Sequence, residues 1–425
     1  MTTRQLPEAS DTASPPPAVD VNSDTVSRRA MGIIAMGATA FGLGAVAVNS
    51  VGYLAPAIQD DLDIGRGMVG AISSVFFATS GLSSLVLPPV AVRLGTRITV
   101  AVSLAAITLG ATFAAVSGTL ISLFTFTALG GCAHALITMA TNSAVAAAVP
   151  LRRRALGLTT KTAGGPLLSA VYALVAGILV TSLGWRGVVA TSAGLALMGA
   201  IAAVRVFEPV PVQVARAHAT PQTPLPRVVL LLAASGFLIG AGAQPLFTWL
   251  LPFLRDEVDL SSSAAGVVTA VATASGVIGM ITVAVMSDRL GTHLRLVVLS
   301  ATIAMGAMAT ATMIFATPGR VAMVFVAAIV GIISYTGAIG VLHTATVDVA
   351  PHAVERASGA VMAGFYIGGW LAPFGFGLLA DAGGYDLAWA CASGSLVIST
   401  VLAAAAIAGA RRELADQSGF RARAT

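Results

Sequence analysis

The stretch YLAPAIQDDLDI, residues 53–64, occurs a second time in altered form as WLLPFLRDEVDL, residues 249–260. In both copies a proline comes three residues after an aromatic residue, and an acidic cluster follows. Each copy leads through an apolar span to a turn with an arginine and a glycine, VRLGT at 92–96 and DRLGT at 288–292. The offset between the copies is 196 residues at both ends. A match that keeps register over this distance predicts an internal repeat, and a repeat sets the architecture of a chain.

The composition is that of a membrane protein. Apolar residues make up 56% of the 425 residues and charged residues only 10%, whereas soluble domains carry about 25% charged residues. Apolar runs of about 20 residues, long enough to cross a bilayer, recur along the whole chain. They do not alternate in polarity as barrel strands do, so we expect helices. The twelve expected spans lie near residues 30–56, 68–92, 97–117, 120–147, 156–182, 186–206, 228–251, 263–286, 294–315, 320–348, 357–380 and 387–410.

Arginines are distributed unevenly between the expected loops. With the N-terminus inside, fifteen arginines lie at the inner ends of spans, against four in the outer loops, at positions 66, 186, 255 and 320. Inner loops of membrane proteins are enriched in basic residues. We therefore expect a multi-pass protein of the inner or plasma membrane with both termini in the cytoplasm. Because the basic residues are spread over short loops, they do not indicate a nucleic-acid partner.

Polar stretches divide the chain into five parts. Residues 1–27 are rich in Ser, Thr, Pro and Asp and are expected to form a disordered cytoplasmic tail. Residues 208–227 separate six spans from six and are expected to be a cytoplasmic linker. The two six-helix bundles are then expected at 28–207 and 228–411, followed by a second cytoplasmic tail at 412–425.

This organisation resembles the major facilitator superfamily over about residues 30–410. The family signature is a loop G-x-L-A-D-R-x-G-R-K between the second and third spans of a half. The residues that match it are Arg93, Gly95 and Arg97 in the first half, and Asp288, Arg289 and Gly291 in the second. The resemblance implies an all-α integral membrane fold, with twelve transmembrane helices in two pseudo-symmetric six-helix bundles. It also implies that the halves rock around a central site near mid-membrane.

The charged residues of this loop are expected to act in gating. Asp288 and Arg289 are expected to bridge to the ends of the tenth and eleventh spans, most plausibly to Arg356 and to Asp348 or Glu355. The first half has no acidic residue near its motif. The alternative interpretation of its arginines is that they anchor loops to lipid headgroups. The expected gating residues are Arg93, Arg97, Asp288, Arg289, Asp348 and Arg356.

Lys161 is the one lysine of the chain, against twenty-two arginines, and it lies inside the fifth span. Gly165 and Tyr172 follow at i+4 and i+11, on the same helical face. Small residues and a tyrosine on that face indicate a protein interior rather than lipid. The alternative is that Lys161 extends along the helix to the cytoplasmic surface. A charge at membrane depth usually marks function.

Polar side chains also line one face of the fourth span. They are His134, Thr138, Thr141 and Asn142, at i, i+4, i+7 and i+8. The tenth span, its repeat mate, places Tyr335 opposite His134 and His343 opposite Asn142. A lone histidine is often a packing residue, but four polar groups on one face favour a cavity lining. The expected substrate-binding residues are Lys161, His134, Thr138, Asn142, Tyr172, Asn49, Gln244, Tyr335 and His343.

These residues favour a secondary transporter for a small organic anion attracted by Lys161. With no carboxylate in the middle of a span, proton coupling would run through His134, His343 or Lys161, and exchange or uniport is equally open. The alternative is proton-coupled efflux of a drug or metabolite. Drug/proton antiporters of the superfamily carry G-x8-G-x3-G-P-x2-G-G in the fifth span, and aligning its GP with Gly165-Pro166 places Lys161 on a glycine.

Other classes of protein are less well supported by the sequence. A membrane receptor or sensor should carry a sizeable cytoplasmic module, and the tails are short. No spacing resembles a nucleotide loop, a metal site or a nucleophile triad, so we expect no enzyme and no cofactor. The expected partners are a small-molecule substrate and the lipid bilayer, with protons as a candidate coupling ion. The protein is expected to be a monomer.

Overall fold

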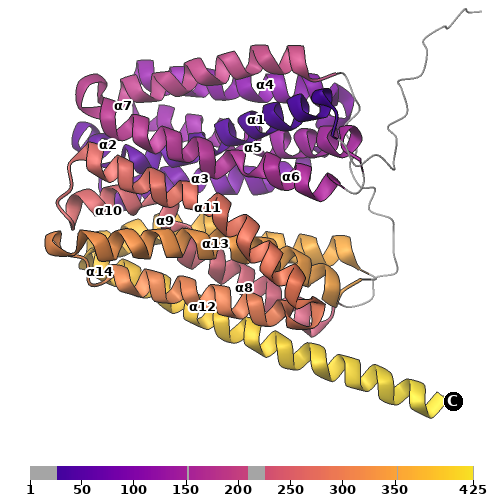
Figure 1. Cartoon of the computed structure of the whole chain (residues 1–425). Helices are drawn as coiled ribbons and strands as arrows, with labels where there is room; N and C mark the ends of the chain where they lie inside the picture. The colour runs from indigo at the N-terminus through magenta and orange to yellow at the C-terminus, as the bar shows by residue number, and fades with distance from the viewer. Residues whose placement is uncertain (1–25, 151–152, 209–224, 352, 425) are drawn as a thin grey trace, which may run out of the picture.

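The computed structural model describes residues 26–150, 153–208, 225–351 and 353–424. Most of the expected tail, residues 1–25, and most of the expected linker, residues 209–224, lie outside the described residues. The elements of the described chain are all helices. Figure 1 shows two stacked groups of helices with parallel long axes, the first half in indigo to magenta and the second in pink through orange to yellow.

The helices follow the expected division into halves. The first half contains α1 (Arg28–Tyr53), α2 (Ala55–Leu62), α3 (Arg66–Val86), α4 (Pro88–Ser117), α5 (Leu120–Ala148), α6 (Arg154–Thr162) and α7 (Gly164–Val206). The second contains α8 (Arg227–Ala243), α9 (Pro245–Thr248), α10 (Leu250–Asp256), α11 (Ser262–Leu290), α12 (Arg295–Met313), α13 (Val321–Val349) and α14 (Val354–Ala424). The first and seventh spans are thus each broken into shorter helices near one end, with α2 and α10 as their last pieces.

Two of the helices cross the membrane twice. By length and composition the described chain has ten candidate spans, and two of these, Leu156–Val206 and Arg356–Gly409, have 51 and 54 residues. At 1.5 Å per residue each would be about 80 Å long, against a hydrocarbon core of about 30 Å. Gly184 (φ 63°, ψ 175°) and Gly384 (φ 77°, ψ 175°) reverse the chain inside them. The expected twelve transmembrane helices are therefore confirmed.

The repeat is visible in the backbone itself. Asp63 and Asp259, 196 residues apart, are the two non-glycine residues with positive φ in the described chain, at 50° and 56°. Aspartate is one of the few residues that adopts this region at modest cost. Gly95 (φ 70°, ψ 169°) and Gly291 (φ 84°, ψ 168°), also 196 apart, share a conformation that a Cβ would strain. The sequence repeat is thus a structural repeat.

The second span is interrupted just before its end. The helix breaks after Val86, and Pro88 begins α4, whose first turn continues the span toward Gly95. Proline has no backbone N–H and is accepted in the first turn of a helix, where that donor has no partner. Gly95 then reverses the chain inside α4, so that Oγ1 of Thr99 reaches the carbonyl of Ala91, and Gly291 has the equivalent place after α11.

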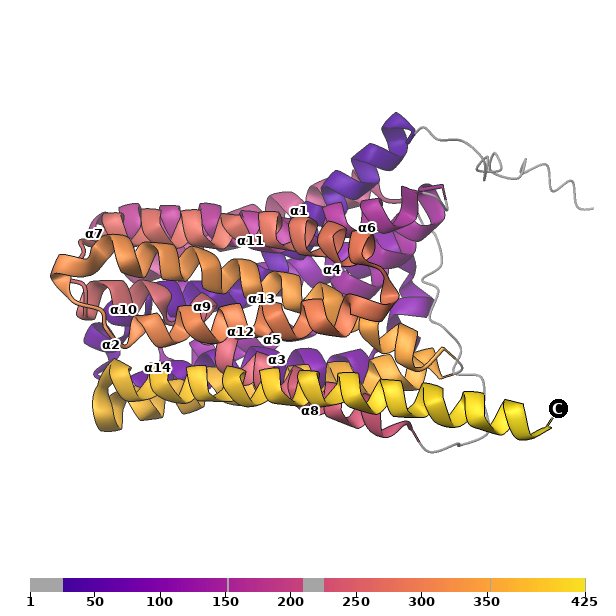
Figure 2. The ribbon, with the colours of Figure 1, turned by 60° about the horizontal axis from the view of Figure 1, so that its bottom comes forward.

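The two halves touch closely near the end of the molecule that carries α2 and α10. A Cβ on Gly70 of α3 would lie 2.1 Å from the carbonyl oxygen of Pro373, and one on Gly177 of α7 would lie 2.9 Å from Cα of Gly266. Only glycine permits these approaches of helix backbones. Figures 1 and 2 place α2, α10 and the reversal of α7 at this end, and the C-terminal end of α14 at the opposite one.

Candidate functional site

Lys161 is enclosed by the first half. The residue is 1% exposed, and its Nζ donates to Oδ1 of Asn142 at 3.0 Å. The same Nζ lies 4.2 Å from the ring centroid of Phe41. Gly37 of α1 makes room for the side chain, because a Cβ there would lie 3.0 Å from Cγ of Lys161. Lys161 therefore does not extend to the membrane surface as the alternative interpretation requires.

The positive charge of Lys161 has no carboxylate partner among the described residues. An ammonium has three donors, and one of them is used by the neutral amide of Asn142. The face of Phe41 contributes a cation–π contact, worth about 0.5–2 kcal/mol. An isolated buried charge costs more than this and calls for a counter-charge. The arrangement can accept an anion.

Of the fourth-span residues, Asn142 binds Lys161 and His134 packs against the same Phe41 ring, but not all have free polar groups. Asn142 is exposed and borders accessible space next to the buried Lys161. The imidazole of His134 lies 4.7 Å from the ring of Phe41 between centroids, and its Nδ1 is buried with no hydrogen-bond partner in the described chain. The hydroxyl of Thr138 donates to the carbonyl of His134 at 2.7 Å. Of these residues, His134 and Asn142 are therefore the ones that keep polar atoms free to bind a ligand.

In the second half, the structure brings two of the expected residues together. The hydroxyl of Tyr335 donates to Oε1 of Gln244 at 2.7 Å, and its ring lies 5.3 Å from that of Phe247. Tyr335 and Gln244 are 9% and 5% exposed. His343 is used locally, because its Nδ1 lies 2.8 Å from the carbonyl oxygen of Ile339. These residues form a polar group separate from Lys161.

Two further expected residues hold helices of the first half together. Nδ2 of Asn49 donates to Oγ of Ser169 at 2.8 Å. The hydroxyl of Tyr172 donates to the carbonyl of Val188 at 3.0 Å, between the two arms of α7. Both residues are buried. The structure does not bring them into hydrogen-bond contact with Lys161.

At the end of the molecule opposite α2 and α10, two of the expected gating residues, Asp288 and Asp348, share a cation that was not among them. Arg295 binds Asp288 at 3.1 Å and Asp348 at 2.5 Å, and its side chain is 12% exposed. Sequence reasoning paired Asp288 with Arg356, and missed Arg295. The turn at Gly291 folds α12 back beside α11, so that a residue seven positions on meets Asp288.

The remaining gating residues lie at the surface. Arg289 and Arg93 are exposed, and Arg97 is half-buried. In the part of the chain that the structure describes, these three have no ion-pair partner. Arg356 is exposed near the start of α14. The first-half loop thus lacks the ion-pair cluster of the second, in agreement with its lack of nearby acids.

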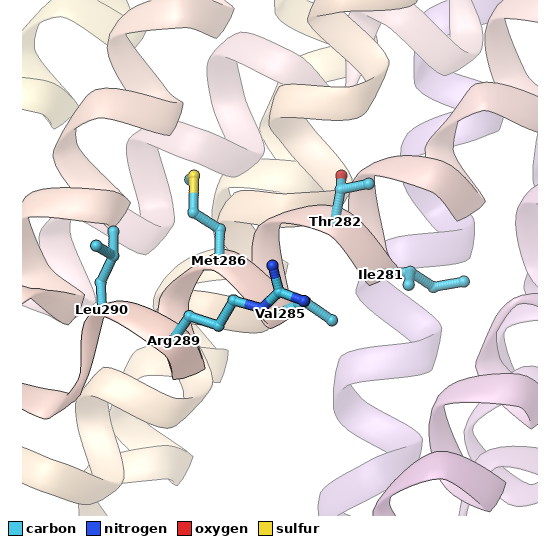
Figure 3. Close-up of a pocket in the computed structure, with 6 residues that line it drawn as sticks. All are labelled: Ile281, Thr282, Val285, Met286, Arg289 and Leu290. Atoms are coloured by element: carbon cyan, nitrogen blue, oxygen red, sulfur yellow. The ribbon is translucent and has the colours of Figure 1, made fainter.

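Arg289 borders a surface hollow of about 510 Å³. The residues that line it are Ile281, Thr282, Val285, Met286, Arg289 and Leu290. Figure 3 shows the Arg289 side chain lying back along α11 toward Val285, on one face of the helix. All six residues belong to a single helix, and none belongs to the Lys161 group.

At the other end an ion pair joins the halves. Nη2 of Arg66, the first residue of α3, binds Oδ2 of Asp256 at the end of α10 at 3.0 Å. Asp381 of α14 accepts from the backbone N–H groups of Arg66 at 3.1 Å and Gly67 at 2.8 Å. The hydroxyl of Tyr385 also donates to Asp256 at 3.0 Å. We call Arg66, Asp256, Asp381 and Tyr385 the inter-half latch.

The first half has a partial counterpart of this latch. Nε1 of Trp185 donates to Asp61 at 3.0 Å, and Arg186 binds the same carboxylate oxygen at 2.7 Å. Trp185 and Tyr385 both follow a chain-reversing glycine. The sequence showed these acids and arginines, but gave no signal for their pairing, because the partners lie more than a hundred residues apart.

Comparison with known proteins identifies the fold. The family model described as Major Facilitator Superfamily matches residues 34–373. A bacterial homolog to the human lysosomal transporter Spinster, solved in an inward-facing and unoccupied conformation, has 14% identity and a TM-score of 0.70, covering 91% of this chain and 97% of its own. A D-xylose-proton symporter has 12% identity and a TM-score of 0.72, covering 88% and 97%.

A third solved structure, the nucleoside transporter NupG in a mutant form, has 16% identity and a TM-score of 0.69, covering 90% of this chain and 99% of its own. At these identities the structures are similar in fold alone. No curated protein matches the sequence of this chain.

Proposed function

Because the chain belongs to the major facilitator superfamily, a family of secondary transporters, we propose that its substrate is a small organic anion with a carboxylate. In this proposal the anion binds at Lys161 and crosses the bilayer by alternating access of the two halves. The protein lies in the inner or plasma membrane, with both termini in the cytoplasm.

The observation that carries the proposal is the state of Lys161. Its side chain is buried, its Nζ has a neutral amide and an aromatic face for partners, and its charge is unpaired among the described residues. A carboxylate would supply the missing charge and accept the two spare N–H groups. An anchoring lysine would have its head at the membrane surface.

Access to the cation is through Asn142. That residue is exposed, whereas Lys161 next to it is 1% exposed. A carboxylate entering from the side of Asn142 would replace the amide oxygen as acceptor for Nζ. The amide could then donate from Nδ2 to the same carboxylate, so that Asn142 keeps Lys161 in place when the site is empty.

The inter-half latch supports the direction of access. Because Arg66 binds Asp256 across the halves near α2 and α10, the described conformation is tied at this end. By the arginine distribution this end is the outer one. Asn142 lies near the opposite, inner end of the molecule, because it is close to the last residue of α5, Ala148. The site would then be reached from the cytoplasm in this conformation.

The proposal allows two forms of coupling, proton symport and anion exchange. His134 is the nearest group that can exchange a proton, since it packs against the same Phe41 ring as Lys161. In symport a proton and the anion would cross together, and in exchange one anion would return for another. We propose a monomer as the working unit.

The test is transport by purified protein in liposomes. Carboxylate uptake should depend on Lys161 and be absent from liposomes that contain Lys161→Gln. A pH gradient without counter-anion should drive uptake in symport, whereas internal anion alone should drive it in exchange. Transport of hydrophobic cations, unchanged by Lys161→Gln and without carboxylate uptake, would instead establish the efflux alternative.

A further inference from the structure

The surroundings of Lys161 are aromatic rather than polar. The ring centroid of Phe41 lies 4.2 Å from Nζ and 4.7 Å from the centroid of the His134 imidazole. His134 lies in turn 5.4 Å from the ring of Phe76. Phe41 and His134 are both half-buried. A ligand bound at Nζ would therefore have aromatic faces beside it.

The aromatic side chains continue to the boundary between the halves. The rings of Phe76 and Phe77 lie 5.4 Å apart, and Phe77 lies against Gly369 of the second half, where a Cβ would be 3.2 Å from its Cδ1. One helical turn earlier in α14, Phe365 packs 6.1 Å from Tyr335 between centroids. Rings thus lie at intervals between the cation of the first half and the tyrosine of the second, with Gly369 between Phe77 and the rings of the second half.

Free hydrogen-bond donors are few along this series. The hydroxyls of Thr138 and Thr141 each donate to a carbonyl of their own helix at 2.7 Å. The hydroxyl of Tyr335 donates to Gln244. This leaves Lys161, the amide of Asn142 and the imidazole of His134 as the groups that can bind a carboxylate. A polyol needs many hydrogen bonds, and a dicarboxylate needs a second cation.

From this combination of one cation, few free donors and a series of rings, we infer that the substrate is an aromatic monocarboxylate. The inference rests on the proposed function, since it needs the carboxylate at Lys161. The ring of the substrate lies beside Phe41 and His134, where edge-to-face and offset contacts are available. The ammonium of Lys161 selects for the carboxylate, and the rings select for the aromatic part of the substrate.

The experiment is equilibrium binding to the purified full-length chain, with four probes. Benzoate carries the ring and the charge, cyclohexanecarboxylate has the charge without the aromatic ring, succinate has two charges, and benzylammonium has the ring with the opposite charge. Benzoate should bind tightest. Its preference over cyclohexanecarboxylate should be about twofold to tenfold, the usual gain of an aromatic pair over area alone.

Variants at Phe41 show whether this ring carries the preference. Phe41→Leu should bring benzoate and cyclohexanecarboxylate to equal affinity, and Phe41→Tyr, which keeps the ring, should retain the preference. Phe113→Leu is the matched control, because Phe113 lies on α4 with 45% exposure. It should bind as the unchanged protein does. The four-probe comparison on the unchanged protein stands even where a variant fails to fold.

The outcomes separate the two proposals. Equal or tighter binding of succinate or cyclohexanecarboxylate than of benzoate would overturn the aromatic inference and leave the carboxylate proposal standing. Tighter binding of benzylammonium than of benzoate, or no binding of any carboxylate, would overturn both. Benzoate preference that persists in Phe41→Leu would also contradict the inference, because the ring beside Nζ would then be unused.

Discussion

Lys161 and Asn142 are joined by a 3.0 Å hydrogen bond from a buried ammonium to a neutral amide oxygen. The pair connects α6 to α5, the helices of the fifth and fourth spans. The bond orients the ammonium without neutralising it. An anion can therefore compete for Nζ, which an internal carboxylate would prevent.

Replacing Lys161 by glutamine should abolish carboxylate transport while the protein still reaches the membrane. Loss of a charged hydrogen bond costs about 1.5–3 kcal/mol, or about 10- to 150-fold in affinity. Lys161→Arg should rescue poorly, because the planar guanidinium needs a fork of partners and the site offers Asn142 and Phe41. Uptake in vesicles, normalised to protein, measures both. Full activity in both variants would remove the anion proposal.

Replacing Asn142 by aspartate should inhibit more strongly than replacing it by alanine. The new carboxylate would occupy Nζ permanently and compete with the substrate for it, whereas alanine leaves Nζ open. We expect at least tenfold weaker anion binding for Asn142→Asp than for Asn142→Ala, about 1.4 kcal/mol. Isothermal titration on purified protein decides the order. Equal affinities would show that the substrate does not share this acceptor position.

Adding a methyl group at Gly37 should displace Lys161. A Cβ at this position would lie 3.0 Å from Lys161 Cγ, which is tighter than ordinary contact, and 3.5 Å from Thr141 Cβ, which is an ordinary contact. Gly37→Ala should therefore weaken anion binding severalfold. Gly32→Ala, on the same helix with nothing within 4 Å of its Cβ, is the control and should leave binding unchanged. Identical binding curves for the two variants would contradict the assigned packing.

Removing the charge of Asp256 should loosen the outer end of the molecule. The pair with Arg66 is 30% exposed on both sides, so we expect about 1 kcal/mol or less, and a shift of up to about fivefold in the population that is open at this end. Thiol labelling from the outside at Ser74→Cys, with Cys132 and Cys391 replaced by alanine, reports this opening.

Labelling at Ser74→Cys should be faster in Asp256→Asn, because Ser74 is buried beside the second half, where its Oγ accepts from the backbone N–H of Phe374. Glu257→Gln is the control, since Glu257 is exposed and has no ion pair in the described chain. An unchanged rate in Asp256→Asn would show that the latch does not hold the halves together.

Replacing Arg295 by glutamine should slow transport more than it weakens substrate binding. Arg295 holds Asp288 and Asp348 together, and without it two carboxylates would repel each other. Asp288→Asn should have a milder effect, because Arg295 keeps Asp348. Turnover and binding constant measured on the same preparation separate the two effects, and Arg289→Gln, at an exposed arginine without an ion pair among the described residues, is the control. A binding loss as large as the loss of turnover would place Arg295 in substrate binding instead.

The spans and the repeat could be predicted from the sequence because they depend on local properties. Hydrophobicity over about 20 residues decides whether a segment crosses a bilayer, and the reversal inside α7 at Gly184 falls between the spans expected at 156–182 and 186–206. The 196-residue offset anticipated equivalent conformations at Gly95 and Gly291, which the backbone shows. The helix break after Val86 was not predicted, although Pro88 allows a helix to restart there.

The candidate site was predicted in part. A single lysine within a span stood out, and the four-residue spacing of the fourth span placed Asn142 and His134 on one face. Spacing along one helix says nothing about the neighbouring helix, however. Phe41 could not be connected to Lys161, 120 residues later, until α1 and α6 were packed together.

The sequence by itself determined that the chain forms twelve membrane helices in two related halves, because transfer of apolar segments into lipid depends on composition alone. Only the tertiary structure decided which polar groups meet. It paired Asp288 with Arg295 and Arg66 with Asp256, and it turned Tyr172 toward a backbone carbonyl. These pairings depend on the rotation and close approach of packed helices, which arise from many weak contacts between segments distant in the chain.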